Sequence, residues 1–492
     1  MNFISTRGHA QKVTAAQAIA RGLAPDGGLF VPETIPQLTE KDISALCKMS
    51  YPERAAKILS LYLSDYTEEE LLEDCRAVYA ETSFVGGAAP LVALDNTLNV
   101  LELWHGPTAA FKDMALQIMP RLLSRALKKI GEKRTALILV ATSGDTGKAA
   151  LEGYRDLDQI KIIVFYPVDG VSKVQKLQMA TQLGDNVSVC AIRGNFDDAQ
   201  TGVKKIFGNA EIAAKLNEKG YFLSSANSIN WGRLAPQIVY YVSAYCDLIN
   251  AGKRKPGEPF NVCVPTGNFG NIFAAYLAKR MGLPIGKLIC ASNSNNILTD
   301  FLTTGVYDRN RSFYLTMSPS MDILISSNLE RLLWATTGTE KTADYMKRLN
   351  ETGKYTVESD TLATIQKDFA GYFANEDETA ATILKFWNDD NYLADPHTAV
   401  ALSAAQTYLK ETGDTIPMVV DSTASPYKFA NNVFRSIAKK EPSGDLEALD
   451  ELTELTGVKI PYPLAGLKNR TVRFREVCDP DEMPDRVLQF AD

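Results

Sequence analysis

The chain has 492 residues, of which 45% are hydrophobic and 23% are charged, a composition typical of soluble proteins with about two to four domains. Its net charge of −7 argues against nucleic acid or an anionic membrane as the main partner. No apolar run approaches the roughly 20 residues that cross a bilayer. The cysteines stand singly and the start of the chain has no targeting pattern, which predicts a reduced, cytoplasmic protein. The histidines have no ligand spacing, so we expect no metal site.

Residues 1–90 are predicted to form a separate N-terminal domain that is largely helical. Apolar residues recur at helical spacing in four stretches, Ala15–Gly22, Asp42–Met49, Pro52–Leu63 and Thr67–Ala80. The pair Gly86-Gly87 marks the boundary of this domain, because adjacent glycines interrupt regular structure.

Residues 133–225 are predicted to form a small α/β domain, because apolar runs typical of buried strands alternate there with helical stretches. The strands are expected at Thr135–Ala141, Ile160–Tyr166 and Val187–Ile192. The helices are expected at Gly147–Leu157, Val171–Leu183 and Phe196–Asn209. This alternation indicates a parallel, doubly wound sheet.

A second parallel-sheet domain is predicted from three separate parts of the chain, residues 91–132, 226–319 and 392–440. Its strands are expected at Val100–Trp104, Phe260–Val264, Leu288–Ala291 and Ile416–Val420. The second series of strands and helices begins with Tyr221–Ser225, and the boundary between the two domains is placed after this strand, at residue 225. Residues 320–391 are charged and helical in pattern, and we expect a helical insertion there. The tail 441–492 carries no chemistry that we can identify.

A single lysine, Lys112, lies among small and apolar residues in the stretch His105–Asp113, directly after an expected strand. A helical stretch follows at Met114–Lys129, with a kink expected at Pro120. Such strand-to-helix junctions are where α/β folds place their chemistry. Burial lowers the pKa of a lysine, and a neutral amine forms a Schiff base with a carbonyl compound. From these residues alone, a lysine that extends from a helix start into solvent remains the alternative.

Two loops with glycines follow expected strands. Ala141–Gly147 (ATSGDTG) precedes a helix, so its N–H groups suit an anion; it lacks the Walker spacing, and a capped turn is an equally good interpretation. Pro265–Asn271 (PTGNFGN) suits a backbone nest for a phosphate. It lacks the G-x-G-x-x-G spacing of a dinucleotide site, so a smaller phosphate fits better.

Two further clusters are polar. The hydroxyls of Asp421–Phe429, after the last expected strand, either meet a ring nitrogen or cap the next helix. Asn227–Arg233 combines amides and a guanidinium at a helix start, which suits a second phosphate or an ordinary capped helix. His397 follows Pro396 in a first helical turn and is interpreted as structural.

Taken together, these stretches resemble the threonine synthase family, in the longer form found in bacteria and fungi. The resemblance covers most of the chain up to about residue 435 and is carried by STRG (5–8), GLAPDGGLFVP (22–32), HGPTAAFKD (105–113), ATSGDTG (141–147), PTGNFGN (265–271) and DPHTAV (395–400). It implies an α/β fold with two doubly wound parallel-sheet domains of the fold type II pyridoxal-phosphate (PLP) enzymes, an N-terminal helical domain and a helical insertion. The implied activity is that of a lyase in threonine biosynthesis, which converts O-phospho-L-homoserine and water to L-threonine and phosphate.

The resemblance also implies roles for the cofactor site. Lys112 would carry PLP covalently and serve as the catalytic base. Thr423 would hydrogen-bond the pyridine nitrogen. The cofactor phosphate would be held by Gly267, Asn268, Phe269 and Asn271.

For the substrate, the resemblance implies two anion sites. The carboxylate would bind at Ser143, Gly144, Asp145 and Thr146. Asn230 and Arg233 would lie near the phosphate. Related enzymes often have asparagine where Asp145 stands, and Ser425 stands where the family is expected to have histidine.

The nearest alternative function is a PLP-dependent phospholyase, which would form a 2-oxo acid from a phosphohydroxy amino acid with the same cofactor residues. A nucleotide-binding or phosphotransfer protein is disfavoured, because the Walker pattern and clustered magnesium-binding acids are absent from the sequence. A catalytically silent relative is disfavoured by the lysine and the two glycine-containing loops.

Overall fold

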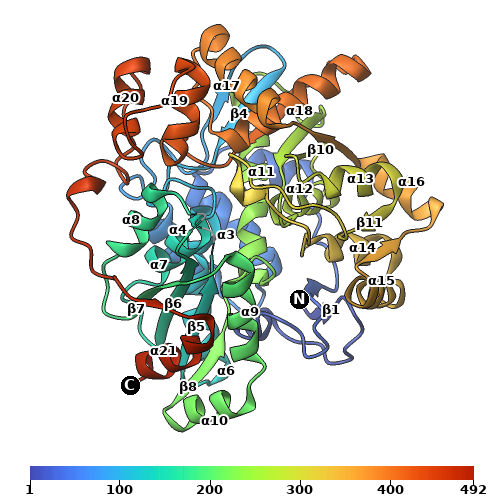
Figure 1. The fold of residues 1–492 in the computed structure, drawn as a ribbon. Helices are drawn as coiled ribbons and strands as arrows, with labels where there is room; N and C mark the ends of the chain where they lie inside the picture. Colours follow the sequence, from blue (N-terminus) through green and yellow to red (C-terminus); the bar gives the residue numbers. More distant parts are fainter. Residues whose placement is uncertain (143, 170) are drawn as a thin grey trace.

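The computed structural model describes residues 1–142, 144–169 and 171–492. Its two main β-sheets lie in different parts of the molecule, the larger in the upper half of Figure 1 and the smaller in the lower half. The long helix α11 (Trp231–Asn250) runs through the centre of this view. The predicted fold class with two parallel sheets is confirmed. In the described residues, no helix is long and apolar enough to cross a membrane.

The smaller sheet has the strand order β15-β7-β6-β5-β8, and all its neighbouring strands are parallel. Its strands are β5 (Thr135–Ala141), β6 (Ile160–Pro167), β7 (Val187–Ile192), β8 (Tyr221–Ser224) and β15 (Val477–Cys478). The helices along this part of the chain are α7 (Asp145–Tyr154), α8 (Lys173–Ala180), α9 (Phe196–Phe207) and α10 (Ala210–Glu218). β8 belongs to the smaller sheet and not to the second series of strands, because it pairs with β5 on the side opposite to β6.

The larger sheet has the order β13-β10-β9-β14-β4-β3, parallel except for β3. Its strands are β3 (Leu91–Ala93), β4 (Leu98–Glu102), β9 (Phe260–Pro265), β10 (Ile285–Ser292), β13 (Phe369–Phe373) and β14 (Met418–Ser422). Besides α11, the helices along these parts of the chain are α5 (Asp113–Leu116), α6 (Met119–Ile130), α12 (Gly270–Arg280), α13 (Ile297–Thr304), α18 (Pro396–Thr412) and α19 (Ala430–Ala438).

The N-terminal region contains the four predicted helices, α1 (Ala15–Arg21), α2 (Glu40–Leu46), α3 (Tyr51–Tyr62) and α4 (Glu68–Val78). Thr14, Thr39 and Thr67 cap three of them by accepting a backbone N–H of the first turn. An antiparallel pair, β1 (Phe3–Ser5) and β2 (Phe30–Pro32), was not predicted, because three-residue strands are too short to show alternation.

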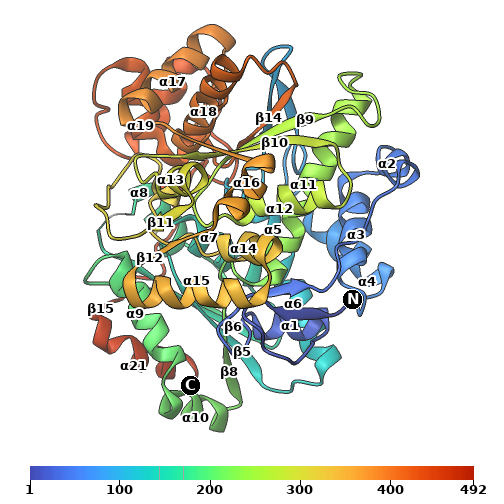
Figure 2. The ribbon, with the colours of Figure 1, turned by 90° about the vertical axis from the view of Figure 1, so that its right-hand side faces the viewer.

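The stretch 320–391, predicted as a helical insertion, is only partly helical. It contains the helices α14 (Leu329–Thr337), α15 (Thr339–Thr352), α16 (Ser359–Asp368) and α17 (Glu376–Asp390), of which α14, α15 and α16 face the viewer in Figure 2. Its strand β12 (Lys354–Thr356) pairs with β11 (Val306–Asp308), and β13 extends the larger sheet beside β10. Gly371 of β13 packs closely on α13, because a Cβ at this position would lie 2.9 Å from the backbone of Thr299. This close approach is a tertiary contact, which the local sequence pattern does not reveal.

The chain after residue 440 packs on α19 and then joins the smaller sheet. Helix α20 (Glu447–Thr456) packs on α19, and the chain then runs down one side of the molecule to β15 and α21 (Met483–Phe490) (Figure 1). β15 pairs with β7 at the border of the smaller sheet.

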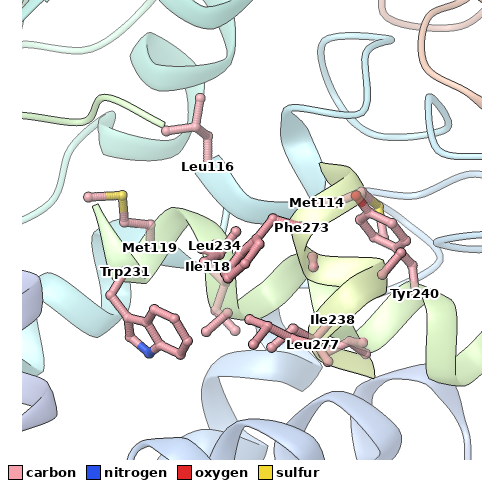
Figure 3. Packing of buried hydrophobic residues seen from close by; sticks show 14 of the residues in the cluster. Met114, Leu116, Ile118, Met119, Trp231, Leu234, Ile238, Tyr240, Phe273 and Leu277 are labelled. Atoms are coloured by element: carbon pink, nitrogen blue, oxygen red, sulfur yellow. The ribbon is translucent and has the colours of Figure 1, made fainter. Parts of the chain in front are cut away.

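The helices α5, α6, α11 and α12 build a hydrophobic core next to the stretch His105–Asp113, called the Lys112 loop below. Figure 3 shows Met114, Ile118, Leu234 and Phe273 packed together there, all at most 1% exposed. Instead of one helix kinked at Pro120, the chain forms two helices. Pro120 lies in the first turn of α6, where its missing N–H costs no hydrogen bond.

Candidate active site

The Lys112 loop and the Thr423 loop lie side by side at the carboxyl ends of two neighbouring parallel strands, β4 and β14. The Phe111 N–H donates to the Thr423 carbonyl at 2.8 Å, and the Ser425 N–H donates to the Ala109 carbonyl at 3.0 Å. The structure therefore brings together two predicted motifs that are far apart in the sequence. Their position is where open α/β sheets bind ligands.

The environment of the Lys112 amine favours its neutral form. Desolvation lowers the pKa of Lys112 to about 8, although the Asp145 carboxylate partly offsets this effect. Nζ lies 3.4 Å from Ser320 Oγ and 4.8 Å from the centre of the Phe111 ring. A neutral lysine amine is both a nucleophile for a carbonyl carbon and a base. The site is therefore suited to capture an aldehyde covalently.

The loop Gly267–Asn271 forms a cradle of backbone N–H groups at the start of α12. Phe269 has a φ of 63°, in the left-handed region. The carbonyls of Gly267 and Asn268 accept from Ser326 Oγ at 2.7 Å and from Asn328 Nδ2 at 2.9 Å. Among the described residues, no acceptor is found for the N–H groups of residues 267–270. Unpaired N–H groups at a helix start favour a phosphate.

Residues 317–328 pack over this cradle, a contact that the sequence analysis missed. The Ser320 N–H donates to His397 Nε2 at 3.2 Å, and His397 Nδ1 lies 2.7 Å from Asp395 Oδ1. His397, interpreted as structural, thus holds Ser320 in place beside Lys112. The available signal was the Ser318-Pro319-Ser320 sequence, which lies at the start of the stretch predicted as a helical insertion.

Two hydroxyls of the stretch Asp421–Phe429 have different surroundings. Thr423 is buried, and within the described part of the chain its hydroxyl has no partner, so it is free to meet a ring nitrogen. Ser425 Oγ accepts from the Tyr427 N–H at 3.3 Å and caps the 3₁₀ turn Pro426–Phe429. Ser425 is therefore occupied as a cap.

The loop before α7 keeps two backbone donors for an anion. Thr142 Oγ1 accepts from the N–H groups of Gly144 and Gly147 at 3.0 and 2.9 Å. The N–H groups of Asp145 and Thr146 have no acceptor in the residues that the structure describes. Ser143, predicted as part of this site, lies outside those residues.

The Asp145 side chain is engaged within the protein. Its Oδ1 lies 2.8 Å from Lys428 Nζ and 2.8 Å from Gln175 Nε2, and both charged side chains are buried. Burial alone would raise the pKa of Asp145, but the charges of Lys428 and Lys112 hold it well below its usual range. Because Asp145 stays ionised, we expect only its backbone N–H to serve a substrate carboxylate.

Lys428 was not predicted as a site residue. The sequence did hold a signal, because Lys428 is the one charged residue between Asp421 and Arg435. A lone charge in an apolar stretch of a buried loop needs a partner nearby. That partner, Asp145, lies far away in the sequence and could not be identified from spacing.

Arg233, at the start of α11, is buried and keeps an unpaired donor. Its Nη1 donates to the Ala226 carbonyl at 2.6 Å, whereas Nε has no partner in the described structure. Burial lowers the pKa of Arg233 to about 10, so it remains charged at neutral pH. Asn230 has both ends of its amide occupied: Nδ2 donates to the Ile19 carbonyl, and Oδ1 caps α11 by accepting from Gly232, each at 2.9 Å. Of this predicted pair, Arg233 offers the free donor.

Family models match three consecutive parts of the chain. Residues 2–79 match the threonine synthase N terminus, residues 82–420 the pyridoxal-phosphate dependent enzymes, and residues 398–483 the C-terminal region of threonine synthase.

Individual proteins give similar results. Threonine synthase of Pseudomonas aeruginosa is 40% identical over 449 residues, which are 90% of this chain and 92% of that protein. Threonine synthase-like 1 of Homo sapiens is 41% identical over 460 residues and 89% of this chain, which spans only 61% of that longer relative. The crystal structure of PLP-bound threonine synthase from Brucella melitensis matches with a TM-score of 0.89 at 38% identity, over 100% of this chain and 99% of that one.

Proposed function

This chain belongs to the threonine synthase family of pyridoxal-phosphate-dependent enzymes, and on that premise we propose that it converts O-phospho-L-homoserine and water to L-threonine and phosphate. The observation that carries the proposal is a buried lysine, with a pKa lowered to about 8, in one site with two separate anion binders. One is the N–H cradle of residues 267–270, and the other is the buried guanidinium of Arg233. A PLP enzyme with a phosphorylated substrate needs two such binders, one for each phosphate.

The donor set suits PLP. The unpaired N–H groups of residues 267–270 suit the PLP phosphate. The Thr423 hydroxyl suits the pyridine nitrogen, and the Lys112 amine suits the aldehyde. When bound, PLP supplies an electron sink for the charge that develops as C–H bonds of the amino acid break. Since a hydroxyl does not protonate the pyridine nitrogen as a carboxylate would, this sink is moderate.

Lys112 is the base in this proposal. Its amine removes the Cα proton and then a Cβ proton, after which phosphate leaves from Cγ. Water adds at Cβ, and the returned protons complete the Cγ methyl group and the Cα–H bond. A base with a pKa near the working pH transfers protons efficiently in both directions, and Lys112, with a pKa of about 8, meets this requirement.

The substrate anions are assigned to two helix starts. The N–H groups of Asp145 and Thr146 at α7 suit the carboxylate. The Arg233 guanidinium at α11 suits the phosphate, because it is charged at neutral pH and keeps Nε free.

Product analysis tests this function. The full-length protein with PLP should convert O-phospho-L-homoserine to threonine and phosphate. Formation of a 2-oxo acid in place of threonine would instead support the phospholyase alternative.

Chemical labelling tests the role of Lys112 separately. Reduction with borohydride in the presence of PLP, followed by peptide mapping, should label this residue. Labelling of the buried Lys148 or of the exposed Lys173 in its place would overturn the assignment.

We also propose a cytoplasmic location and a small-molecule substrate without a nucleic-acid partner. All seven cysteines are unpaired thiols, which suits a reducing compartment. The net charge of −7 disfavours binding to a polyanion.

A further inference from the structure

The ion pair between Lys428 and Asp145 is buried inside the site and has no role in the reaction described above. The side chains are 0% and 3% exposed, with Nζ 2.8 Å from Oδ1. Lys428 also donates to the Thr108 carbonyl at 3.0 Å, in the same loop as Lys112. The pair therefore joins the Lys112 loop to the start of α7, between the predicted cofactor and substrate sites.

Such a pair is costly to build. Moving two charges out of water carries a desolvation penalty that their attraction repays only with good geometry and further hydrogen bonds. Here Gln175 supplies a hydrogen bond to Asp145, and Thr108 accepts one from Lys428. A lone buried carboxylate would be less favourable still, and the charges of both Lys428 and Lys112 favour the ionised form of Asp145.

Four charged groups act on the Lys112 amine from the elements packed around it. Asp145 of α7 and Asp113 of α5 favour a proton on the amine, whereas Arg233 of α11 and Lys428 of the turn Pro426–Phe429 disfavour it. Ser320 adds an uncharged hydroxyl. Of the two carboxylates, Asp145 acts more strongly on Lys112.

We propose that Lys428 and Asp145 work as one neutral unit that sets the charge of the Lys112 amine, with Lys428 neutralising the carboxylate that would otherwise hold a proton on Lys112. Lys428 is thus a positioning residue that acts on the reacting amine through Asp145. This inference deepens the proposed function, since it rests on Lys112 being the amine that reacts with PLP.

Removing the charge of Lys428 and removing the charge of Asp145 should shift the titration of Lys112 in opposite directions. Lys428→Met leaves Lys112 as the cation that acts on the Asp145 carboxylate, so Lys112 should hold its proton to higher pH. Asp145→Asn leaves the Lys428 charge unopposed, so Lys112 should lose its proton at lower pH. One neighbouring charge shifts a titration by about one to three pH units, so each shift should be about one unit or more. In the double variant the two effects should largely cancel, because the pair is removed as a whole.

The titration is measured on the full-length chain after removal of PLP. A short pulse of acetic anhydride acetylates only deprotonated amines and releases acetate, and peptide mass spectrometry gives the fraction modified at Lys112 between pH 6 and pH 11. Circular dichroism at each pH verifies that the variants are folded. The buried pair Lys148–Glu152 of the same helix, whose lysine is bound to Gln182, provides the control variants Lys148→Met and Glu152→Gln.

Shifts of opposite sign that cancel in the double variant, with an unshifted control pair, would establish the unit. Midpoints that stay the same, or that move in one direction in both single variants, would overturn it. If Lys428→Met does not fold, Asp145→Asn and the double variant suffice, because a downward shift that the second substitution fails to reverse contradicts the proposal. Different results would contradict the proposed function, namely the absence of threonine as a product or the absence of a PLP label at Lys112.

Discussion

Gly267 and Ser320 approach each other so closely that a Cβ on Gly267 would lie 2.6 Å from the Ser320 carbonyl oxygen. Gly267→Ala would therefore force residues 317–328 away from the cradle, because a backbone atom cannot give way as a side chain can. We expect at least about a tenfold loss of PLP affinity, the effect of losing one charge-assisted hydrogen bond to the phosphate. Retention of PLP on dialysis, followed by its absorbance, measures this.

Gly270→Ala is the matched control for Gly267→Ala. A Cβ there would meet Asn328 Nδ2 at 3.5 Å, an ordinary contact, and the substitution keeps the backbone N–H. PLP binding should be nearly unchanged. Equal losses in the two variants would mean that the loop fails for a reason other than the Ser320 contact.

Asn271→Ala should weaken PLP binding by about tenfold or more, because a charge-assisted hydrogen bond contributes roughly 1.5–3 kcal/mol. In the structure, Asn271 Nδ2 donates to the Pro265 carbonyl at 3.3 Å, and Oδ1 accepts from the Ile272 N–H at 3.0 Å. One amide N–H is thus left for the cofactor phosphate. Asn271→Asp should cost more than Asn271→Ala, since it adds a negative charge beside the phosphate. Equal PLP affinity in all three proteins would reduce this residue to a helix cap.

Arg233→Ala should spare PLP binding, raise KM for O-phospho-L-homoserine and also lower kcat. The reason is that negative charge grows on the departing phosphate, so the guanidinium stabilises the transition state more than the bound substrate. Arg233→Lys should recover only part of the activity, because an ammonium group cannot bind two oxygens in a fork. Steady-state kinetics of the three proteins measure both effects.

Arg54→Lys controls for the loss of a buried guanidinium near α11. Arg54 donates to Ser243 Oγ and to Asp247, each at 2.7 Å, and thereby ties α3 to α11. This variant should lower the melting temperature and leave KM unchanged. Wild-type kinetics for Arg233→Ala would remove the phosphate role and leave Arg233 as part of a capped helix.

Asp421→Asn should stabilise the protein at alkaline pH. Burial raises the pKa of Asp421 to about 8, so the folded chain binds one proton more than the unfolded chain between about pH 4 and pH 8, and stability falls as pH rises through that window. Tyr241 donates to Oδ2 at 2.7 Å, and Oδ1 has no partner in the described structure, so an amide fits. The expected gain is on the order of 5 kcal/mol at pH 8 and about 1–2 kcal/mol at pH 5, which urea unfolding at the two pH values would test.

Asp113→Asn should have the opposite effect on stability. The Asp113 carboxylate accepts from the Thr108 N–H, the Thr108 hydroxyl and Gln117 Nε2, at 2.7–2.9 Å. An amide would place its N–H groups against one of these donors and lose that hydrogen bond, at a cost of about 1–3 kcal/mol. A stabilising Asp113→Asn would show that neutralising a buried carboxylate outweighs its hydrogen bonds in this protein.

The central strands could be predicted well from the sequence. β5 and β7 begin and end at the predicted residues, because continuous apolar runs bounded by turns are typical of strands buried on both faces. β13 was missed for the converse reason: its five residues include a glycine, and its pairing with β10 depends on a distant partner. The local sequence pattern thus identified the central strands, which are buried on both faces. The strands at the border of the sheet depend on tertiary contacts and could not be predicted from that pattern.

The site shows the same division. Lys112 and the loop Gly267–Asn271 carry their signal within a few residues, since backbone geometry at a strand-to-helix junction is locally encoded. Lys428 and Ser320 reach the site from separate segments, and their roles depend on partners that no spacing reveals. Asn230 caps α11 with its Oδ1, and its place beside the substrate phosphate stays a prediction, because local chemistry alone could not separate the two roles.

The two-residue strand β15 has a consequence for the behaviour of the chain in solution. The N–H groups of Ala191 and Arg193 in and after β7 donate to the carbonyls of Glu476 and Cys478, at 2.9 and 3.0 Å. Without the tail, these donors would be offered to any other extended chain, and exposed sheet borders of this kind promote aggregation. The tail thus covers a sheet border that would otherwise be open to pairing with another extended chain.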